Sequence, residues 1–327
     1  MPKVTIAIPT YNGALYLEEC LESAINQTFS DIEIVVVDDC STDGTFGVAE
    51  RFARLDNRVK LFRNNTRMGL VENWNRSIQY STGEWIKFLF QDDLLYEKCI
   101  EKMFGAARST ENGATNSLVV GERNFVIENG IEDNLRLFYE NSVITLNDIF
   151  RGKSRISPEA FSGAIMERGV GLNFVGEPTS VMIKRDICFQ YSFFNRNLVQ
   201  LCDLEYWTRL GTNEGLVYVP EVLSDFRVHN RSASAHNHAH RRFQLECLDK
   251  IILLHDYLYH PYYFNLRKTA DSVTMLSNYL KNELMNVAGP GTAFDRQDKE
   301  TLLHALTEKY PILNKTWMNP VFLKPNP

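Results

Sequence analysis

The chain has 327 residues, a net charge of −6 and 44% apolar residues, which is typical of a folded protein with one large domain or a domain and an extension. The acidic balance argues against a nucleic acid as the main partner, because binding a phosphate backbone requires a basic surface. No stretch approaches the roughly 20 consecutive apolar residues that a membrane span requires. We therefore expect at most peripheral association with a membrane.

The cysteines and the first residues of the sequence bear on the cellular compartment that we expect for the protein. The six cysteines lie far apart in the sequence and form no CxxC pair, which favours reduced, mostly buried thiols over disulfides or a thiolate metal site. The chain passes from Met1 directly into a strand-like run, without the pattern of a signal peptide. Both observations predict a cytoplasmic protein, with the inner face of the membrane as the alternative place for it.

Short apolar runs alternate with amphipathic segments over about the first 110 residues. The strand-like runs are VTIAI, IEIVVV, VKLFR and WIKFLF, at residues 4–8, 32–37, 59–63 and 85–90. The second run is apolar throughout, as expected of a central parallel strand that is covered on both faces. This alternation predicts an α/β protein with a doubly wound, mostly parallel sheet.

The rest of the chain is less regular. We expect strands that form a smaller mixed sheet, then a helical tail. The expected elements are two strands within 117–127, a strand at 180–184, a helix at 203–212, a strand segment at 215–229 and helices from about 239 to 284. Gly and Ser are frequent from residue 154 to 176, where we expect loops.

Three polar clusters follow the expected strands. They are PTYNG at residues 9–13, DDCSTDGT at 38–45 and QDDL at 91–94. Each cluster alone could be a turn, a helix cap or a solvated loop. Ligands of open α/β sheets bind beyond the carboxyl ends of the strands, and several carboxylates at one edge repel each other unless a cation or a ligand offsets their charge. Taken together, the three clusters predict a ligand site at this edge.

The familiar phosphate-binding loops do not occur in the sequence. The first turn lacks GxGxxG, and no segment matches GxxxxGK[ST]. The phosphates of a nucleotide would therefore need another partner, for which a divalent cation bound to carboxylates is the natural candidate. Hard oxygen ligands fit Mg²⁺ or Mn²⁺.

The segment KVTIAIPTYNGALYLEECLESAINQTFSDIEIVVVDDCSTDGT resembles the opening of the family 2 inverting glycosyltransferases, which adopt the GT-A fold. The similarity continues through NNTRMGLVENWNRSI and GEWIKFLFQDDLL, and it resumes in GEPTSVMIKRD, CDLEYWTRL and FRVHNRSAS. The resemblance implies a metal-dependent enzyme that transfers a sugar from a nucleotide-sugar donor to the hydroxyl of a glycan or lipid-linked acceptor. Surface polysaccharide or glycan synthesis is the implied process.

The same resemblance implies that the chain has three parts. Residues 1–110 would be the nucleotide-sugar-binding half of the GT-A domain, and residues 111–235 would be its acceptor-binding and catalytic half. Residues 236–327 would form a helical C-terminal extension.

Nucleotide-binding residues are carried over from the matching motifs. Pro9 and Tyr11 match positions that border the nucleobase, and Asp39 matches the carboxylate that accepts a hydrogen bond from the base. A carboxylate only accepts, whereas uracil and thymine offer an N3–H and cytosine offers a lone pair. We therefore expect a UDP- or dTDP-sugar. Arg67 is expected to pair with the diphosphate, with an ordinary surface charge as the alternative.

The metal motif is carried over in the same way. QDD matches the family's DxD-type motif, with Gln91 and Asp92 on the nucleotide side and Asp93 toward the metal. Phe90 stands where many relatives carry the first Asp, which leaves fewer carboxylates. His229, in the segment RVH, is expected to contact the metal or the diphosphate, with a structural histidine as the alternative.

Asp203, in CDLEYW, matches the general base of the family. Inverting transfer needs a carboxylate that takes the proton of the acceptor hydroxyl as this hydroxyl attacks the anomeric carbon. The alternatives are that Asp203 only caps its helix, or that Glu205 is the base.

Two other classes of protein remain as alternatives. A nucleotidyltransferase would need a glycine-rich first loop with a basic residue, and PTYNG provides neither. A nucleotide-sugar-binding relative without catalytic activity is kept open by Phe90.

Overall fold

The computed structural model describes residues 1–109, 117–232, 235, 243–288, 300 and 304. The chain divides into two compact units. The first unit contains residues 1–195 and 203–232, and the second contains residues 196–202 and 233–327. Parts of the predicted C-terminal extension, residues 236–242 and almost all residues beyond 288, lie outside the described residues.

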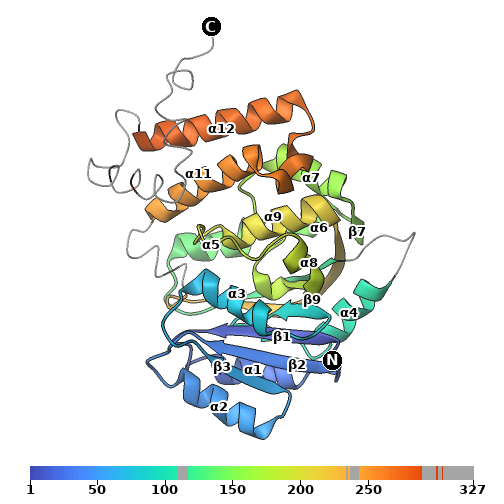
Figure 1. Ribbon diagram of the computed structural model, residues 1–327, viewed down its shortest axis with the longest axis vertical. Coiled ribbons are helices and arrows are strands. Elements are labelled where there is room, and N and C mark those ends of the chain that lie inside the picture. Colours follow the sequence, from blue (N-terminus) through green and yellow to red (C-terminus); the bar gives the residue numbers. More distant parts are fainter. Residues whose placement is uncertain (110–116, 233–234, 236–242, 289–299, 301–303, 305–327) are drawn as a thin grey trace. The chain divides into compact units, whose positions relative to one another are not determined.

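Nine strands of the described residues form one mixed sheet in the first unit (Figure 1). Its order is β3-β2-β1-β4-β8-β6-β9-β5, and β7 also pairs with β9. The strands are β1 (Val4–Thr10), β2 (Ile32–Asp38), β3 (Val59–Arg63), β4 (Trp85–Phe88), β5 (Leu94–Leu95), β6 (Leu118–Ile127), β7 (Arg155–Ile156), β8 (Val181–Lys184) and β9 (Leu216–Val228). Strands β1 to β4 are parallel, as predicted. The mixed part continues the same sheet through the antiparallel strand β8.

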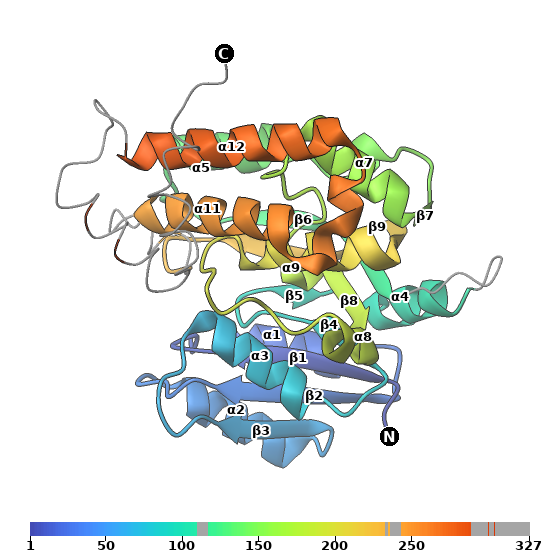
Figure 2. The same cartoon turned by 45° about the horizontal axis from the view of Figure 1, so that its top comes forward.

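Helices cover both faces of the parallel strands, so the predicted doubly wound α/β class is confirmed (Figure 2). Alternate residues of β1, such as Ile6, pack with Leu21 of α1 and Phe52 of α2 in the core of one face, and α3 lies on the other face. The helices of this unit are α1 (Leu17–Ile25), α2 (Thr45–Leu55), α3 (Leu70–Tyr80), α4 (Cys99–Arg108), α5 (Asp133–Asn141), α6 (Leu146–Ile149), α7 (Pro158–Arg168), the 3-10 turn η1 (Pro178–Ser180), α8 (Arg185–Gln190) and α9 (Cys202–Glu214).

Two expectations for the middle of the chain were wrong, whereas the strand expected at residues 215–229 is confirmed as β9. Residues 117–127 form one strand rather than two. The segment 154–176, expected to be loop, contains helix α7. The side chain of Ser157 accepts a hydrogen bond from the backbone N–H of Ala160 at 3.2 Å, and Pro158 occupies the first turn, where a proline is compatible with a helix.

Within the described residues, the second unit contains helices α11 and α12 and a short segment from the middle of the chain. Helix α11 (Phe243–Tyr259) packs against α12 (Ala270–Ala288), and the 3-10 segment η2 (Pro261–Arg267) joins them. Leu248, Ile251 and Ile252 of α11 are buried. No helix of the described residues is long and apolar enough to cross a membrane.

Candidate active site

The loops after β1 and β4 are joined by a pair of hydrogen bonds. The backbone N–H of Tyr11 donates to Oε1 of Gln91 at 2.8 Å, and Nε2 of Gln91 donates to the carbonyl of Tyr11 at 3.1 Å. A Cβ at Gly13 would lie 2.2 Å from that same Oε1, so only glycine leaves room for the Gln91 amide. Gln91 was predicted to bind the nucleotide. In the structure it holds the loop that carries Tyr11.

Pro9 lies inside β1, opposite Val37 of β2, and is buried. A proline has no N–H to give to a sheet ladder and is normally confined to edges. Here the pairing of β1 with β4 ends at Ala7, so no partner strand on that side needs the missing donor.

Asp39 is buried and accepts three hydrogen bonds. Its carboxylate receives the side-chain amide of Asn64 at 2.8 Å and the backbone N–H groups of Met68 and Gly69 at 2.7 and 2.9 Å. A carboxylate has about four acceptor positions, so one position remains for a base N–H. Asp39 therefore also fixes the loop of residues 64–69.

Arg67, in that loop, lies over the ring of Tyr11. Its guanidinium carbon is 4.1 Å from the ring centre, a cation–π contact. The structure thus brings Tyr11, Asp39 and Arg67 together at one end of the sheet. These three residues were predicted to surround the nucleotide.

Asp92, which was predicted on the nucleotide side, lies beside His229, which was predicted to contact the metal or the diphosphate. Oδ2 of Asp92 lies 2.8 Å from Nε2 of His229. Nδ1 of His229 accepts the backbone N–H of Arg231 at 3.2 Å. The ring proton of a neutral His229 therefore sits on Nε2 and is donated to Asp92.

Asp93 lies in different surroundings. It is 1% exposed and accepts hydrogen bonds from the hydroxyl of Thr179 and from the backbone N–H of Arg227, the latter at 2.9 Å. Burial, followed by the nearby carboxylate of Asp92, raises the pKa of Asp93 well above its usual range. Asp93 therefore links β9 to the loop that contains Gln91, Asp92 and Asp93. The carboxylate of Asp92 instead lies beside His229. The sequence resemblance had placed Asp93 toward the metal and Asp92 on the nucleotide side.

The ligands present suit a divalent cation that is only partly bound by protein. Within the described residues, no group of three or more His, Cys, Asp or Glu side chains could hold a metal. Asp92 offers its carboxylate, and His229 offers Nε2 once its ring proton moves to Nδ1 and the hydrogen bond from Arg231 is given up. Mg²⁺ and related ions are commonly bound by one or two protein ligands, with phosphate oxygens and water filling the other positions. Phe90 has no side-chain atom that can bind a metal, and its ring packs on Trp74, with ring centres 4.5 Å apart.

Asp203 lies in the first turn of α9. Its Oδ1 accepts the backbone N–H of Leu204 at 2.7 Å, and its Oδ2 accepts the side-chain amide of Asn173 at 3.2 Å. Burial raises the pKa of Asp203 to about 7, and the carboxylate of Glu177 adds to this rise, while the Leu204 hydrogen bond and the charge of Arg123 oppose it. A carboxylate with a pKa near neutrality is suited to take and release a proton.

The loop before η1 supports this carboxylate. Glu177 forms a buried ion pair with Arg123 of β6. The guanidinium of Arg123 occupies the space beside Gly176, which has a φ of 102° and would place a Cβ 2.6 Å from the guanidinium carbon. The indole N–H of Trp207 donates to the carbonyl of Gly176 at 3.1 Å. Asn173, Glu177 and Arg123 were not predicted as site residues, because their contacts join distant parts of the sequence.

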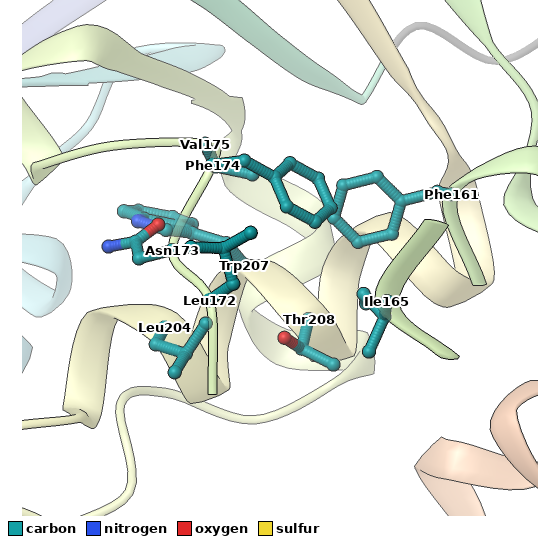
Figure 3. A pocket seen from close by; sticks show the side chains of 9 residues that line it. All are labelled: Phe161, Ile165, Leu172, Asn173, Phe174, Val175, Leu204, Trp207 and Thr208. Carbon is teal, nitrogen blue, oxygen red and sulfur yellow. The ribbon is translucent and has the colours of Figure 1, made fainter. Parts of the chain in front are cut away.

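A small cavity is lined in part by residues 172–175 of this loop (Figure 3). Its volume is about 10 Å³, which is room for about one water molecule and too little for a sugar. The rings of Phe161 and Phe174 line it and pack edge to face, with centres 5.3 Å apart. Its lining is mainly apolar: Phe161, Ile165, Leu172, Asn173, Phe174, Val175, Leu204, Trp207 and Thr208. Leu204 and Trp207, two of the lining residues, therefore anchor the start of α9 in an apolar environment.

Glu205, the alternative base, is engaged elsewhere. Its carboxylate lies 2.9 Å from Nη2 of Arg209, and both side chains are buried. Arg209 also donates to the backbone carbonyls of Tyr191 and Phe193. A carboxylate held in such a pair is poorly placed to accept a substrate proton, which leaves Asp203 as the better candidate.

Comparison with known proteins identifies the family. A family model described as "Glycosyl transferase family 2" matches residues 5–170, about half of the chain. The chain therefore belongs to glycosyl transferase family 2.

Two curated relatives illustrate the range of similarity. An uncharacterized protein of Mycobacterium tuberculosis is 30% identical over 224 residues, which cover 68% of this chain and 66% of the relative. The GalNAc(5)-diNAcBac-PP-undecaprenol beta-1,3-glucosyltransferase of Campylobacter jejuni is 36% identical over 108 residues, or 33% of this chain and 35% of that protein. The chain thus spans about two thirds of the length of the first relative and about a third of the second.

Solved structures share the fold. The mannosyltransferase PcManGT from Pyrobaculum calidifontis, in complex with GDP-Man and Mn²⁺, aligns with a TM-score of 0.56 and 20% identity over 98% of this chain and 85% of its own. TarS 1–349 of S. aureus, in complex with UDP, aligns with a TM-score of 0.54 and 16% identity, over 96% and 91% of the two chains. At these identities the likeness shows the fold, which is GT-A, as the sequence resemblance implied.

Proposed function

We propose that this protein is an inverting glycosyltransferase that moves a sugar from a UDP- or dTDP-sugar to an acceptor hydroxyl in the presence of Mn²⁺ or Mg²⁺. The observation that carries the proposal is Asp203, a carboxylate with a pKa of about 7 in the unit that also holds Asp39 and the Asp92–His229 pair. Membership of glycosyl transferase family 2 supports the type of reaction and a role in glycan synthesis.

In this mechanism Asp203 takes the proton of the acceptor hydroxyl while its oxygen attacks the anomeric carbon. The new C–O bond forms on the face opposite the diphosphate, and the bond between the anomeric carbon and the diphosphate oxygen breaks. The amide of Asn173 holds the Asp203 carboxylate in orientation through the 3.2 Å hydrogen bond. Asp92 and His229 would hold a divalent cation, which would neutralise charge on the leaving diphosphate.

The proposed preference for a particular nucleobase follows from Asp39. Three of its acceptor positions are filled by the loop of residues 64–69, and the remaining one accepts the N3–H of uracil or thymine. The two structural neighbours bind different nucleotides, UDP in TarS and GDP-Man in PcManGT, so the shared fold does not set this preference. A cytosine would place its N3 lone pair against the carboxylate, which is repulsive.

The acceptor is proposed from the relatives. The Campylobacter jejuni protein is named for an undecaprenol-linked acceptor, which supports a glycan or lipid-linked acceptor and a place at the membrane surface for this chain as well.

Calorimetry and turnover test the proposal. We expect UDP to bind more tightly with Mn²⁺ than without it and more tightly than CDP or GDP. Asp92→Asn and His229→Ala should remove the Mn²⁺ effect while leaving metal-free UDP affinity unchanged. Because Asp93 supports the loop, Asp93→Asn should lower the unfolding temperature as well as the affinity.

The outcomes separate the alternatives. Equal affinity for CDP and UDP would contradict the role of Asp39, and a Mn²⁺ effect that survives in both the Asp92 and the His229 variants would contradict the metal site. Donor binding with Mn²⁺ but no sugar transfer to any glycan or lipid-linked acceptor would contradict the enzymatic proposal and favour a binding protein.

A further inference from the structure

A cluster of aromatic rings in the first unit connects the end of β4 with helix α9. The ring of Phe194 lies 5.6 Å from that of Phe88 and 5.8 Å from that of Trp207, between ring centres. These three side chains are at most 2% exposed. The cluster continues from Phe194 to Trp74 of α3, at 5.2 Å, and from Trp74 to Phe90. Its outer end differs from the rest, because Trp74 and Phe90 are only partly buried.

Trp74 and Phe90, here called the aromatic wall, are held in place by hydrogen bonds of their neighbours and of their own backbone. The side-chain amide of Asn75, next to Trp74, exchanges two hydrogen bonds of 3.0 Å with the backbone of Phe194. The backbone N–H of Phe90 donates to the hydroxyl of Thr179 at 3.3 Å. Rings that are fixed before a ligand arrives lose little conformational freedom when they bind it. The aromatic wall is therefore prepared for contact with a ligand.

The aromatic wall belongs to the same edge of the sheet as the candidate nucleotide residues. Asn73, the neighbour of Trp74, donates its side-chain amide to backbone carbonyls near the ends of β1 and β2, at 3.3 and 3.0 Å. Phe90 immediately precedes Gln91, whose amide holds the loop of Tyr11. The buried part of the aromatic cluster reaches α9, the helix that carries the proposed base. The wall thus joins the nucleotide side of the site to the side of the base.

We propose that the aromatic wall packs against the donor sugar, and that this sugar is a neutral pyranose rather than a uronic acid. The inference rests on the proposed function, in which the transferred sugar lies between the nucleotide and Asp203. Aromatic faces gain dispersion contacts with the C–H groups of a sugar ring but offer no strong hydrogen bond. A carboxylate placed against them would lose water without gaining a partner, and the carboxylate of Asp92 would repel it.

Calorimetry on the full-length protein with Mn²⁺ tests the proposal. The ligands are UDP, UDP-glucose, UDP-galactose, UDP-GlcNAc and UDP-glucuronic acid, and dTDP and dTDP-glucose cover the other base. The variants are Phe90→Ala and Phe90→Leu, of which the second keeps most of the apolar volume but has no ring face. Phe189→Ala is the matched control, because Phe189 of α8 is 60% exposed and its ring packs on Phe193 rather than on the wall.

We expect Phe90→Ala to weaken the tightest-binding neutral nucleotide sugar about tenfold, as for the loss of an apolar group from a binding pocket, and the matching free nucleotide less than about twofold. Phe90→Leu should weaken the same nucleotide sugar to a smaller extent. The wild type should bind UDP-glucuronic acid at least about tenfold more weakly than UDP-glucose, because the carboxylate is desolvated. Phe189→Ala should match the wild type with every ligand.

Equal losses for the nucleotide sugar and the free nucleotide, or no loss for either, would overturn the proposal. Equal affinities of the wild type for UDP-glucuronic acid and UDP-glucose would overturn it as well. If Phe90→Ala does not fold, Phe90→Leu decides by the same comparison. Affinity for neutral donors that depends on Phe90, without transfer of sugar to any acceptor, would refute the proposed enzyme and still support the wall. No binding of either nucleotide or of any donor would overturn both.

Discussion

Replacement of Asp203 by Asn is expected to stop proton transfer and to leave donor binding intact. The Asn side chain has nearly the same shape but accepts no proton at neutral pH. Loss of a positioned general base typically lowers the rate by about 10²–10⁴-fold, and we expect a fall in kcat within this range. UDP affinity should be unchanged, because the nucleotide residues Tyr11 and Asp39 lie on the loops after β1 and β2.

The pH dependence of the wild-type kcat gives a second test of the same assignment. With a pKa of about 7, about a tenth of Asp203 is ionised at pH 6 and about nine tenths at pH 8, so kcat should rise about tenfold between these pH values if ionised Asp203 is the active form. The assay is initial-rate UDP release at saturating donor. A flat profile between pH 6 and 8, or near-normal turnover of Asp203→Asn, would refute the assignment of the base.

The same group makes stability depend on pH in a defined direction. The folded state binds the Asp203 proton more tightly than the unfolded chain does, because the folded pKa of about 7 exceeds the ordinary value of 3.8. The stabilisation from the protonated group is therefore complete below pH 3.8 and is lost as the pH rises to about 7, by at most about 4 kcal/mol. Asn does not ionise. The wild type should thus lose more unfolding free energy than Asp203→Asn between pH 5 and pH 8, as measured by chemical denaturation.

Three further substitutions test the supports of the site. Gly13→Ala should displace the Gln91 amide and weaken UDP binding at least several-fold, measured by calorimetry, and unchanged affinity would contradict the role given to this pair of loops. Glu177→Gln should move the acidic limb of the kcat profile to lower pH, because it removes a charge that raises the pKa of Asp203, and a shift to higher pH would contradict that cause. Asp39→Asn should lower the unfolding free energy by about 1.5–3 kcal/mol, the usual worth of a hydrogen bond to a charged group, and should abolish the preference for UDP over CDP.

The parallel half of the sheet could be predicted from sequence because its signals are local. The apolar run of β2 and the Pro, Asn and Asp residues that follow the strands mark both the elements and their carboxyl ends. The strand expected at residues 215–229 is present as β9, although Pro220 lies within it. In the structure Gly121 pairs with Val219, and Glu122 pairs with Val222, so Pro220 and Glu221 lie in a bulge that needs no N–H from the proline.

The resemblance named candidate site residues, but it did not predict the contacts between them. The resemblance named Asp92, Asp93 and His229 together, but not which carboxylate would face the histidine. That choice depends on the turn of the backbone after β4, where Asp93 is drawn inward by Thr179 and by the N–H of Arg227. Such bonds join residues far apart in the chain, and no local pattern records them. Helix α7 was missed for another reason, since the Ser157–Pro158 signal for a helix start lay within a segment judged by its Gly and Ser content.

The unbroken sheet of the first unit limits how this protein can release its product. Strand β8 pairs with β4 on one side and with β6 on the other, so the strands before it and after it share one ladder of hydrogen bonds. Moving one half against the other would require breaking that ladder, and a hinge between the halves is therefore unfavourable. Opening and closing around the nucleotide must come from the loops at the strand ends. In the proposed function, the rate at which UDP leaves should then depend on loops such as residues 64–69, which the three hydrogen bonds of Asp39 hold in place.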